Sequence, residues 1–309
     1  MRTRFLALAI AAGIGLTTVT PSDAATSRVA VHFDLTKGQQ PENIALAPDG
    51  TAYVTFAAAR QVAAISPNGK IRILATLPAP ADGGAPALGF ALTTGIVRTA
   101  DGTLYFLYAS GDPATTGLYR LRPGRKPQRI AALPGNGLPN GLAYDEPAKT
   151  FYLTDSVLGS ISTVPLHGGP ARTWSSAPEL AAAGFLGANG IKVRHGAIWA
   201  TNLDRGTLLR IPIRPGRPGP VQVKATGLAG IDDIAFAGDE DDQVIAALNA
   251  PNKVVRIDTD GRAVTLLTAG LQNPTSVAVR GRTLYVLSAA YLTATDPNLI
   301  LTTVGAPHA

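Results

Sequence analysis

Six residues that can offer oxygen ligands recur at near-regular intervals along the 309-residue chain. Each opens one copy of a pattern: an apolar stretch, a polar turn, and a second stretch that usually carries an aromatic residue. Successive copies start 43 to 52 residues apart. The opening residues are Glu42, Thr94, Asn140, Asn189, Asp232 and Thr275. Carboxylates and amides without His or Cys are donors that suit a hard divalent cation, provided that the fold brings them together.

The repeat length predicts the fold. A period of 40 to 50 residues with several strands per unit is typical of a β-propeller. In the first unit the opening pair is followed by RQVAAISPNG and KIRILATL, which makes four strands. The sixth unit ends one strand short, and residues 28–35 (RVAVHFDL) can supply the missing strand. We therefore predict an all-β, six-bladed β-propeller with four-stranded blades, closed by N- and C-terminal strands in one blade, which removes exposed sheet edges.

In such a ring, equivalent positions of different blades converge at the axis, so the six opening residues should form one site. Residues 79–93 and 177–188 are the longest interruptions of the repeat, and both precede an innermost strand. We interpret them as candidate lids over the site, the second with a helical turn in PELAAAGFL. Five aromatic residues of the second strands should fill the wedges between blades. They are Tyr53, Tyr105, Tyr152, Trp199 and Tyr285.

The N-terminus has the features of a signal peptide, which we assign to residues 1–25. Arg2 and Arg4 precede the apolar segment Phe5–Leu16, and Ser22-Asp23-Ala24 offers a small-x-small cleavage pattern. The apolar segment is short for a membrane span. We expect a secreted protein, extracellular or in the cell envelope, without membrane attachment after cleavage. A retained N-terminal anchor is the alternative. Residues 26–309 are predicted to form a single propeller domain.

Composition excludes several kinds of chemistry. The chain has no cysteine, which excludes disulfides, thiolate catalysis and cysteine-ligated metals. Its serines lack a G-x-S-x-G context, so serine hydrolase chemistry is unsupported. The net charge is +6, but the basic stretches 120–129 and 210–218 fall at outer turns without interleaved aromatics. We therefore predict no nucleic-acid partner. We expect a monomer that acts on a small molecule.

Four of the opening residues are the predicted metal ligands: the carboxylates Glu42 and Asp232 and the amides Asn140 and Asn189. Calcium is preferred over magnesium because it tolerates irregular coordination by six to eight oxygens. The alternative for each residue alone is capping of a strand start. Four matched positions in one ring favour the metal. Three similar residues at second-strand ends, Asp155, Asn202 and Asn249, are interpreted as turn-stabilising.

At these positions the chain resembles the senescence marker protein/gluconolactonase/luciferin-regenerating enzyme family of six-bladed propellers. In that family a Glu in the first blade, Asn in the third and fourth, and Asp in the fifth surround a divalent cation at the channel mouth. Glu42, Asn140, Asn189 and Asp232 match them in the same order. The phrases PNGLAYDEPAKTFYLTDS and NKVVRIDTDG are also similar to family blades.

The resemblance implies an exported, metal-dependent hydrolase of lactones or related esters. A cation would polarise the carbonyl, and a carboxylate would deprotonate the attacking water. Asp232 is the base that the resemblance implies, whereas Asp233 is expected on the opposite side of an extended strand.

The sequence also departs from the family. Pro41-Glu42-Asn43 stands where Glu-Gly-Pro is usual, and Asp232-Asp233 stands where Asp-Gly is common. Near the second-blade strand start there is no Arg of the kind that holds sugar lactones, so a sugar substrate does not follow. A non-catalytic ligand- or protein-binding propeller remains open, as does a lyase or cyclase related to streptogramin lyases or strictosidine synthases.

Overall fold

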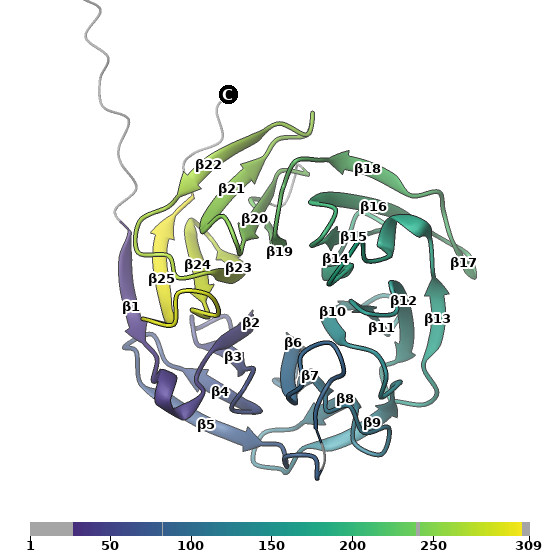
Figure 1. Cartoon of the computed structure of the whole chain (residues 1–309), viewed down its shortest axis with the longest axis horizontal. Helices are drawn as coiled ribbons and strands as arrows, with labels where there is room; N and C mark the ends of the chain where they lie inside the picture. Colours follow the sequence, from purple (N-terminus) through teal and green to yellow (C-terminus); the bar gives the residue numbers. More distant parts are fainter. Residues whose placement is uncertain (1–26, 82, 239–241, 305–309) are drawn as a thin grey trace, which may run out of the picture.

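Six antiparallel sheets surround a central axis in the computed structural model (Figure 1). It describes residues 27–81, 83–238 and 242–304, so the proposed signal segment 1–25 lies outside the described residues. Within them the helical elements are two short 3₁₀ turns, Leu35–Lys37 and Pro178–Leu180. None of the described helices is long and apolar enough to cross a membrane. The predicted all-β, six-bladed propeller is confirmed.

Each blade runs outward from an innermost strand beside the axis. The innermost strands of blades 1 to 6 are β2 (Pro41–Leu46), β6 (Leu92–Arg98), β10 (Pro139–Asp145), β14 (Ala188–Arg194), β19 (Ile231–Phe236) and β23 (Pro274–Arg280). The second strands are β3 (Ala52–Phe56), β7 (Leu104–Ala109), β11 (Thr150–Asp155), β15 (Ala197–Asn202), β20 (Val244–Leu248) and β24 (Thr283–Ser288). The third strands are β4 (Gln61–Ile65), β8 (Gly117–Leu121), β12 (Ser160–Pro165), β16 (Thr207–Arg214), β21 (Lys253–Ile257) and β25 (Asn298–Thr303). The outermost strands are β5 (Ile71–Thr76), β9 (Gln128–Ala132), β13 (Arg172–Ser175), β18 (Gln222–Ala225), β22 (Ala263–Leu267) and β1 (Arg28–His32), and a short β17 (Arg217–Pro218) extends blade 4.

The two ends of the described chain meet in blade 6, where the strand order is β1-β25-β24-β23. β1 pairs antiparallel with β25, with His32 opposite Asn298. The strand ends at His32 because Asp34 then caps the 3₁₀ turn by accepting the N–H of Thr36. The predicted closure of the ring is confirmed.

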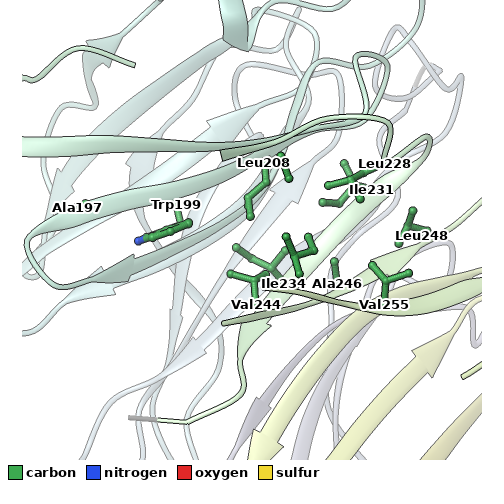
Figure 2. Packing of buried hydrophobic residues seen from close by; sticks show 12 residues of the cluster. Ala197, Trp199, Leu208, Leu228, Ile231, Ile234, Val244, Ala246, Leu248 and Val255 are labelled. Atoms are coloured by element: carbon green, nitrogen blue, oxygen red, sulfur yellow. The ribbon is translucent and has the colours of Figure 1, made fainter. Parts of the chain in front are cut away.

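Large side chains fill the wedges between blades. Figure 2 shows the cluster between blades 4 and 5, in which Trp199, Ile231 and Val244 are almost completely buried. The ring of Trp199 packs edge-on against Phe236, with centroids 5.6 Å apart. The predicted role of the second-strand aromatics in blade packing is confirmed there, because such flat rings fill a wedge well.

Every innermost strand contains a bulge close to its start, where the register with the second strand shifts. A bulge places two residues opposite one, so consecutive side chains need not alternate between the two sides of the sheet. The bulges include the opening residues of the repeat. This local irregularity decides which side chains reach the axis.

The chain direction puts two sets of loops on one end of the propeller, which we call the site face. They are the turns between second and third strands and the connections that lead into the next innermost strand. Both candidate lids lie there, and the second contains the expected turn, Pro178–Leu180. Asn202 holds this loop by donating its amide N–H groups to the carbonyls of Glu179 and Ala181.

Phe33→Ala tests ring closure. Phe33 follows β1 and packs edge-on against Phe56 of blade 1, with centroids 5.1 Å apart. Removing a buried ring leaves a cavity, and we expect the free energy of unfolding to fall by roughly 3 to 5 kcal/mol in urea titrations. Ile73→Ala on β5 is the control, since Ile73 is 40% exposed. Equal losses in the two variants would contradict a stabilising role of the joined termini.

Candidate metal centre at the channel mouth

The four predicted ligands lie at or near the starts of innermost strands in blades 1, 3, 4 and 5. Their exposed fractions are 8% for Glu42, 7% for Asn140, 3% for Asn189 and 6% for Asp232. The Asn189 side chain hydrogen-bonds the Asp232 carboxylate, and the charge of Glu42 acts on the same carboxylate. Asn189 and Asp232 of blades 4 and 5 are therefore in contact, and Glu42 of blade 1 is near enough for its charge to act on Asp232. Asn140 donates its amide Nδ2 to Ser156 Oγ at 3.1 Å, which orients the amide and leaves Oδ1 as the atom that could bind a cation.

Threonine hydroxyls fix the position of two ligands by linking consecutive blades. Thr201 Oγ1 accepts the Gly190 N–H at 2.8 Å and donates to the Asp232 carbonyl at 2.6 Å. Thr154 makes the same two bonds, with the Gly141 N–H and the Asn189 carbonyl. Each hydroxyl thus joins one blade to the ligand-bearing backbone of the next.

The other two opening residues have a different role. Thr94 Oγ1 donates to the Pro139 carbonyl and Thr275 Oγ1 to the Pro41 carbonyl, both at 2.9 Å. Each of these prolines comes directly before a predicted ligand, Asn140 or Glu42. The six oxygen-bearing positions therefore divide into four acids and amides and two hydroxyls that connect backbones.

Glycine follows both amide ligands because the strands approach each other closely. A Cβ on Gly190 would lie 2.6 Å from the Asp232 carbonyl oxygen, and one on Gly141 would lie 2.4 Å from the Asn189 carbonyl oxygen. Real Cβ atoms do not occupy such distances from backbone. The Asn-Gly pairs in blades 3 and 4 thus combine a ligand with the close backbone approach that the ring requires.

Asp233 also faces other blades across the channel, so the expectation that it points away is wrong. Its Oδ1 accepts from Lys192 Nζ at 2.6 Å, and its Oδ2 accepts from Asn43 Nδ2 at 3.1 Å and Ser276 Oγ at 2.7 Å. These partners belong to blades 4, 1 and 6. The physical reason is the bulge in β19, where the register shifts between Ile231 and Ile234 and simple alternation no longer holds.

Burial changes the acidity of the ring carboxylates. Burial, opposed by a hydrogen bond from Tyr291 and reinforced by the charge of Asp233, raises the pKa of Glu42 to about 7. Burial and the charges of Glu42 and Asp233 raise the pKa of Asp232 well above its usual value. The ammonium of Lys192 already pairs with Asp233.

Glu42 and Asp232 thus form a buried acidic pair that a divalent cation would neutralise. Within the described part of the chain, no group of three or more His, Cys, Asp or Glu side chains is arranged to hold a metal. A cation at this place would therefore use the amide oxygens as well. Two carboxylates plus two amides fit a hard, oxygen-preferring ion such as Ca²⁺.

Sequence reasoning missed several polar residues around the ring. Tyr291 donates its hydroxyl to Glu42 Oε2 at 2.6 Å, and Asn249 Nδ2 lies 3.4 Å from Asp232 Oδ2. Tyr291 comes from the loop between β24 and β25, residues 289–297, which is longer than the corresponding turns of the other blades. Asn249 occupies a recurrent position that was interpreted as turn-stabilising. That interpretation is confirmed for Asp155 and Asn202, which accept backbone N–H groups of their turns.

Fold and site together define a six-bladed propeller with a buried ring of carboxylates and amides at its channel mouth. The profile of the SMP-30/gluconolactonase/LRE-like region matches residues 96–290, more than half of the sequence, and the chain belongs to this family. Comparison with curated proteins gave no significant match.

Solved structures share the fold at low identity. A gluconolactonase from Xanthomonas campestris is 13% identical with a TM-score of 0.64, over 92% of this chain and 99% of that one. A luciferin-regenerating enzyme is 13% identical with a TM-score of 0.67, over 91% and 96%. A virginiamycin B lyase from Staphylococcus aureus is 18% identical with a TM-score of 0.61, over 87% and 82%.

Thr201→Val tests the linking hydroxyls. Valine keeps the shape but leaves the Gly190 N–H and the Asp232 carbonyl without their partner. We expect a loss of about 1 to 3 kcal/mol in the free energy of unfolding. Thr201→Ser is the control, because it keeps the hydroxyl and should retain most of the stability. If serine destabilises as much as valine, packing of the methyl group rather than the hydrogen bonds positions the strand.

Proposed function

We propose that the chain is a divalent-metal-dependent hydrolase of lactones or related esters, with Ca²⁺ as the preferred ion. The observation that carries the proposal is the buried pair of carboxylates, Glu42 and Asp232, with Asn189 hydrogen-bonded to Asp232. Burial of two like charges is costly unless a cation compensates them. Membership of the SMP-30/gluconolactonase/LRE-like family and the fold shared with a gluconolactonase support a lactonase over other classes.

In this mechanism, Glu42, Asn140, Asn189 and Asp232 would hold the ion. When bound, the ion supplies a Lewis acid that polarises the ester carbonyl and stabilises the oxyanion. Asp232 accepts the proton of the attacking water. Hydrogen bonds from Asn189 and Asn249 fix the orientation of its carboxylate. The Tyr291 hydroxyl holds Glu42 in the same way. These contacts keep the geometry in place before substrate arrives.

A lyase is the second candidate, favoured by the fold shared with virginiamycin B lyase. The two reactions differ in whether turnover consumes water. Product analysis in ¹⁸O-labelled water distinguishes them, since only hydrolysis places the label in the product. A propeller that binds without chemistry would give neither product.

For the whole chain we further propose export through residues 1–25 and action as a secreted monomer on a small-molecule substrate. The basic residues are not accompanied by interleaved aromatic residues. We therefore propose neither nucleic acid nor a membrane as a partner. Mass spectrometry of the mature protein would locate the N-terminus after export.

Calcium should stabilise the folded ring, because the ligands converge only in the native state. At free calcium about a hundredfold above the dissociation constant the gain is roughly 2.7 kcal/mol. For a chain of this size that corresponds to a rise of roughly 4 to 5 °C in melting temperature, reversed by chelator. Scanning calorimetry combined with a lactone and ester panel, with and without calcium, measures both properties. A melting temperature indifferent to calcium, magnesium and chelator would remove the metal from the proposal.

Asp232→Asn separates ligand from base. We expect calcium to bind roughly tenfold or more weakly, because a charged ligand becomes neutral. If Asp232 is also the base, the rate should remain about 10²- to 10⁴-fold low at saturating calcium, since an amide cannot accept the proton. Recovery of the rate at saturating calcium would show that Asp232 is a ligand only.

Asp155→Asn is the matched control for this variant. Asp155 is 5% exposed, close to the 6% of Asp232, but its carboxylate accepts hydrogen bonds from backbone N–H groups. Its replacement should change stability alone and leave the calcium response intact. Equal loss of calcium binding in both variants would mean that general destabilisation, and not ligand removal, explains the Asp232 result.

A further inference from the structure

Large apolar side chains are exposed around the channel mouth. Among the described residues, six large hydrophobic side chains are exposed, and four of them belong to loops of the site face. Phe90 is 39% exposed, Leu158 42%, Phe185 54% and Leu292 69%. Exposed apolar groups that gather on one face mark a binding surface more often than scattered ones do.

Beneath this rim an apolar cluster surrounds the ring, and we call it the mouth cluster. It contains the buried residues Ala57, Ala85, Leu92, Ala109, Leu138 and Leu186, with the partly buried Ala87, Leu88, Val157, Leu203 and Tyr291 packed against them. Its members come from loops and strand ends of blades 1, 2, 3, 4 and 6. It is therefore shared by five blades and not part of one blade.

The mouth cluster touches the ring directly. Tyr291 belongs to the cluster and donates its hydroxyl to Glu42. Leu138 lies two residues before Asn140, and Val157 follows Ser156, which holds the Asn140 amide. A molecule whose reacting group reaches the ring would therefore come near these alkyl side chains.

The loops that present the apolar groups are fixed by hydrogen bonds to the propeller. Asp204 Oδ2 accepts the N–H groups of Ala183 and Phe185 at 2.9 and 2.7 Å. Asn273 Oδ1 accepts the N–H of Leu292 at 2.8 Å. These bonds fix the loop backbone at Phe185 and Leu292, so both exposed side chains extend from anchored loops.

The cluster provides little to bind hydroxyl groups. All its members are aliphatic except Tyr291, and the Tyr291 hydroxyl is already used by Glu42. A polyhydroxylated sugar placed here would lose hydrogen bonds to water without replacing them. An alkyl or aryl chain would instead gain from leaving water.

We propose that the substrate is an amphiphilic lactone or ester, with its ester group at the ring and an alkyl or aryl substituent of several carbons against the mouth cluster. This inference rests on the proposed hydrolase function for the identity of the reacting group. It adds that Leu88, Val157 and Leu203 determine specificity by contacting the substituent.

A homologous series of δ-lactones, with alkyl substituents from methyl to nonyl, tests the inference, with glucono-δ-lactone as the polar comparison. Each methylene that is fully buried strengthens binding by up to about fourfold. We expect kcat/KM to rise by up to that factor per methylene over the first several carbons, mainly through KM. A flat series, or a preference for glucono-δ-lactone, would overturn the inference.

Substitutions identify the residues that cause the dependence of kcat/KM on chain length. Val157→Ser and Leu203→Ser should reduce the rise of kcat/KM per methylene along the lactone series. Phe185→Ser tests the rim, and Val223→Ser on the outermost strand β18 is its matched control, because Val223 is 51% exposed. Reduction of the slope by Val223→Ser to the same extent would contradict a specific role of the mouth cluster.

A binding measurement separates this inference from the proposed function. Alkyl δ-lactams of the same chain lengths, titrated calorimetrically, report binding without turnover. Lactam affinity that rises with chain length, without hydrolysis of any lactone or ester, would disprove the hydrolase and retain the apolar site. Hydrolysis with a flat series in both assays would retain the hydrolase and disprove the apolar site.

Two other occupants of the rim, a second copy of the chain or a lipid surface, predict different experimental results. If Phe185→Ser abolishes a concentration-dependent dimer in sedimentation experiments while the chain-length series stays flat, the rim is an interface between two copies. If Phe185→Ser abolishes co-flotation with neutral phosphatidylcholine vesicles while the chain-length series stays flat, the rim binds a lipid surface. Either result overturns the substrate assignment.

Discussion

The close convergence of six strand starts around one axis is the constraint on which the rest of the structure depends. At Gly141 and Gly190 the neighbouring backbone leaves no room for a Cβ. The polar backbone atoms brought together there need partners, which the hydroxyls of Thr154 and Thr201 supply. The same bonds hold the carbonyls of Asn189 and Asp232. Blade packing and site geometry therefore have a common physical origin.

The repeat predicted the fold because its period reflects backbone geometry that every blade shares. It also indicated Glu42, Asn140, Asn189 and Asp232, whose burial together at the strand starts follows from equivalence of position. It could not predict Asp233, since a bulge is set by packing and leaves little trace in the pattern of apolar residues. Nor could it predict Tyr291, because this residue lies in a turn that is longer in blade 6 than in the other blades and reaches Glu42 across 249 positions of sequence.

Electrostatics divides the channel into two parts. Asp233 is neutralised by Lys192 and receives two further hydrogen bonds, so its charge is compensated within the protein. Among the described residues, Glu42 and Asp232 receive hydrogen bonds from neutral donors only. These bonds do not offset the effect of burial, which raises the pKa of both carboxyl groups. A paired carboxylate serves structure, whereas a buried pair without a cation can exchange protons for a metal ion. The two residues that depart from the family, Asn43 and Asp233, thus hydrogen-bond to each other across the channel. The four predicted ligand positions are unchanged.

Blade 5 shows how these two parts depend on each other. The strand register places Ala247 where blade 4 has Thr201, so the hydroxyl that could link blade 5 to blade 6 is replaced by a methyl group. The bond between Asp233 and Ser276 joins the two blades instead. Blade 6 is also the blade that the joined termini complete. At this boundary a charged side chain next to Asp232 therefore adds to the bonds that Asn252 and Asn273 make, and a change of charge there would reach both the stability of the propeller and the site at its mouth.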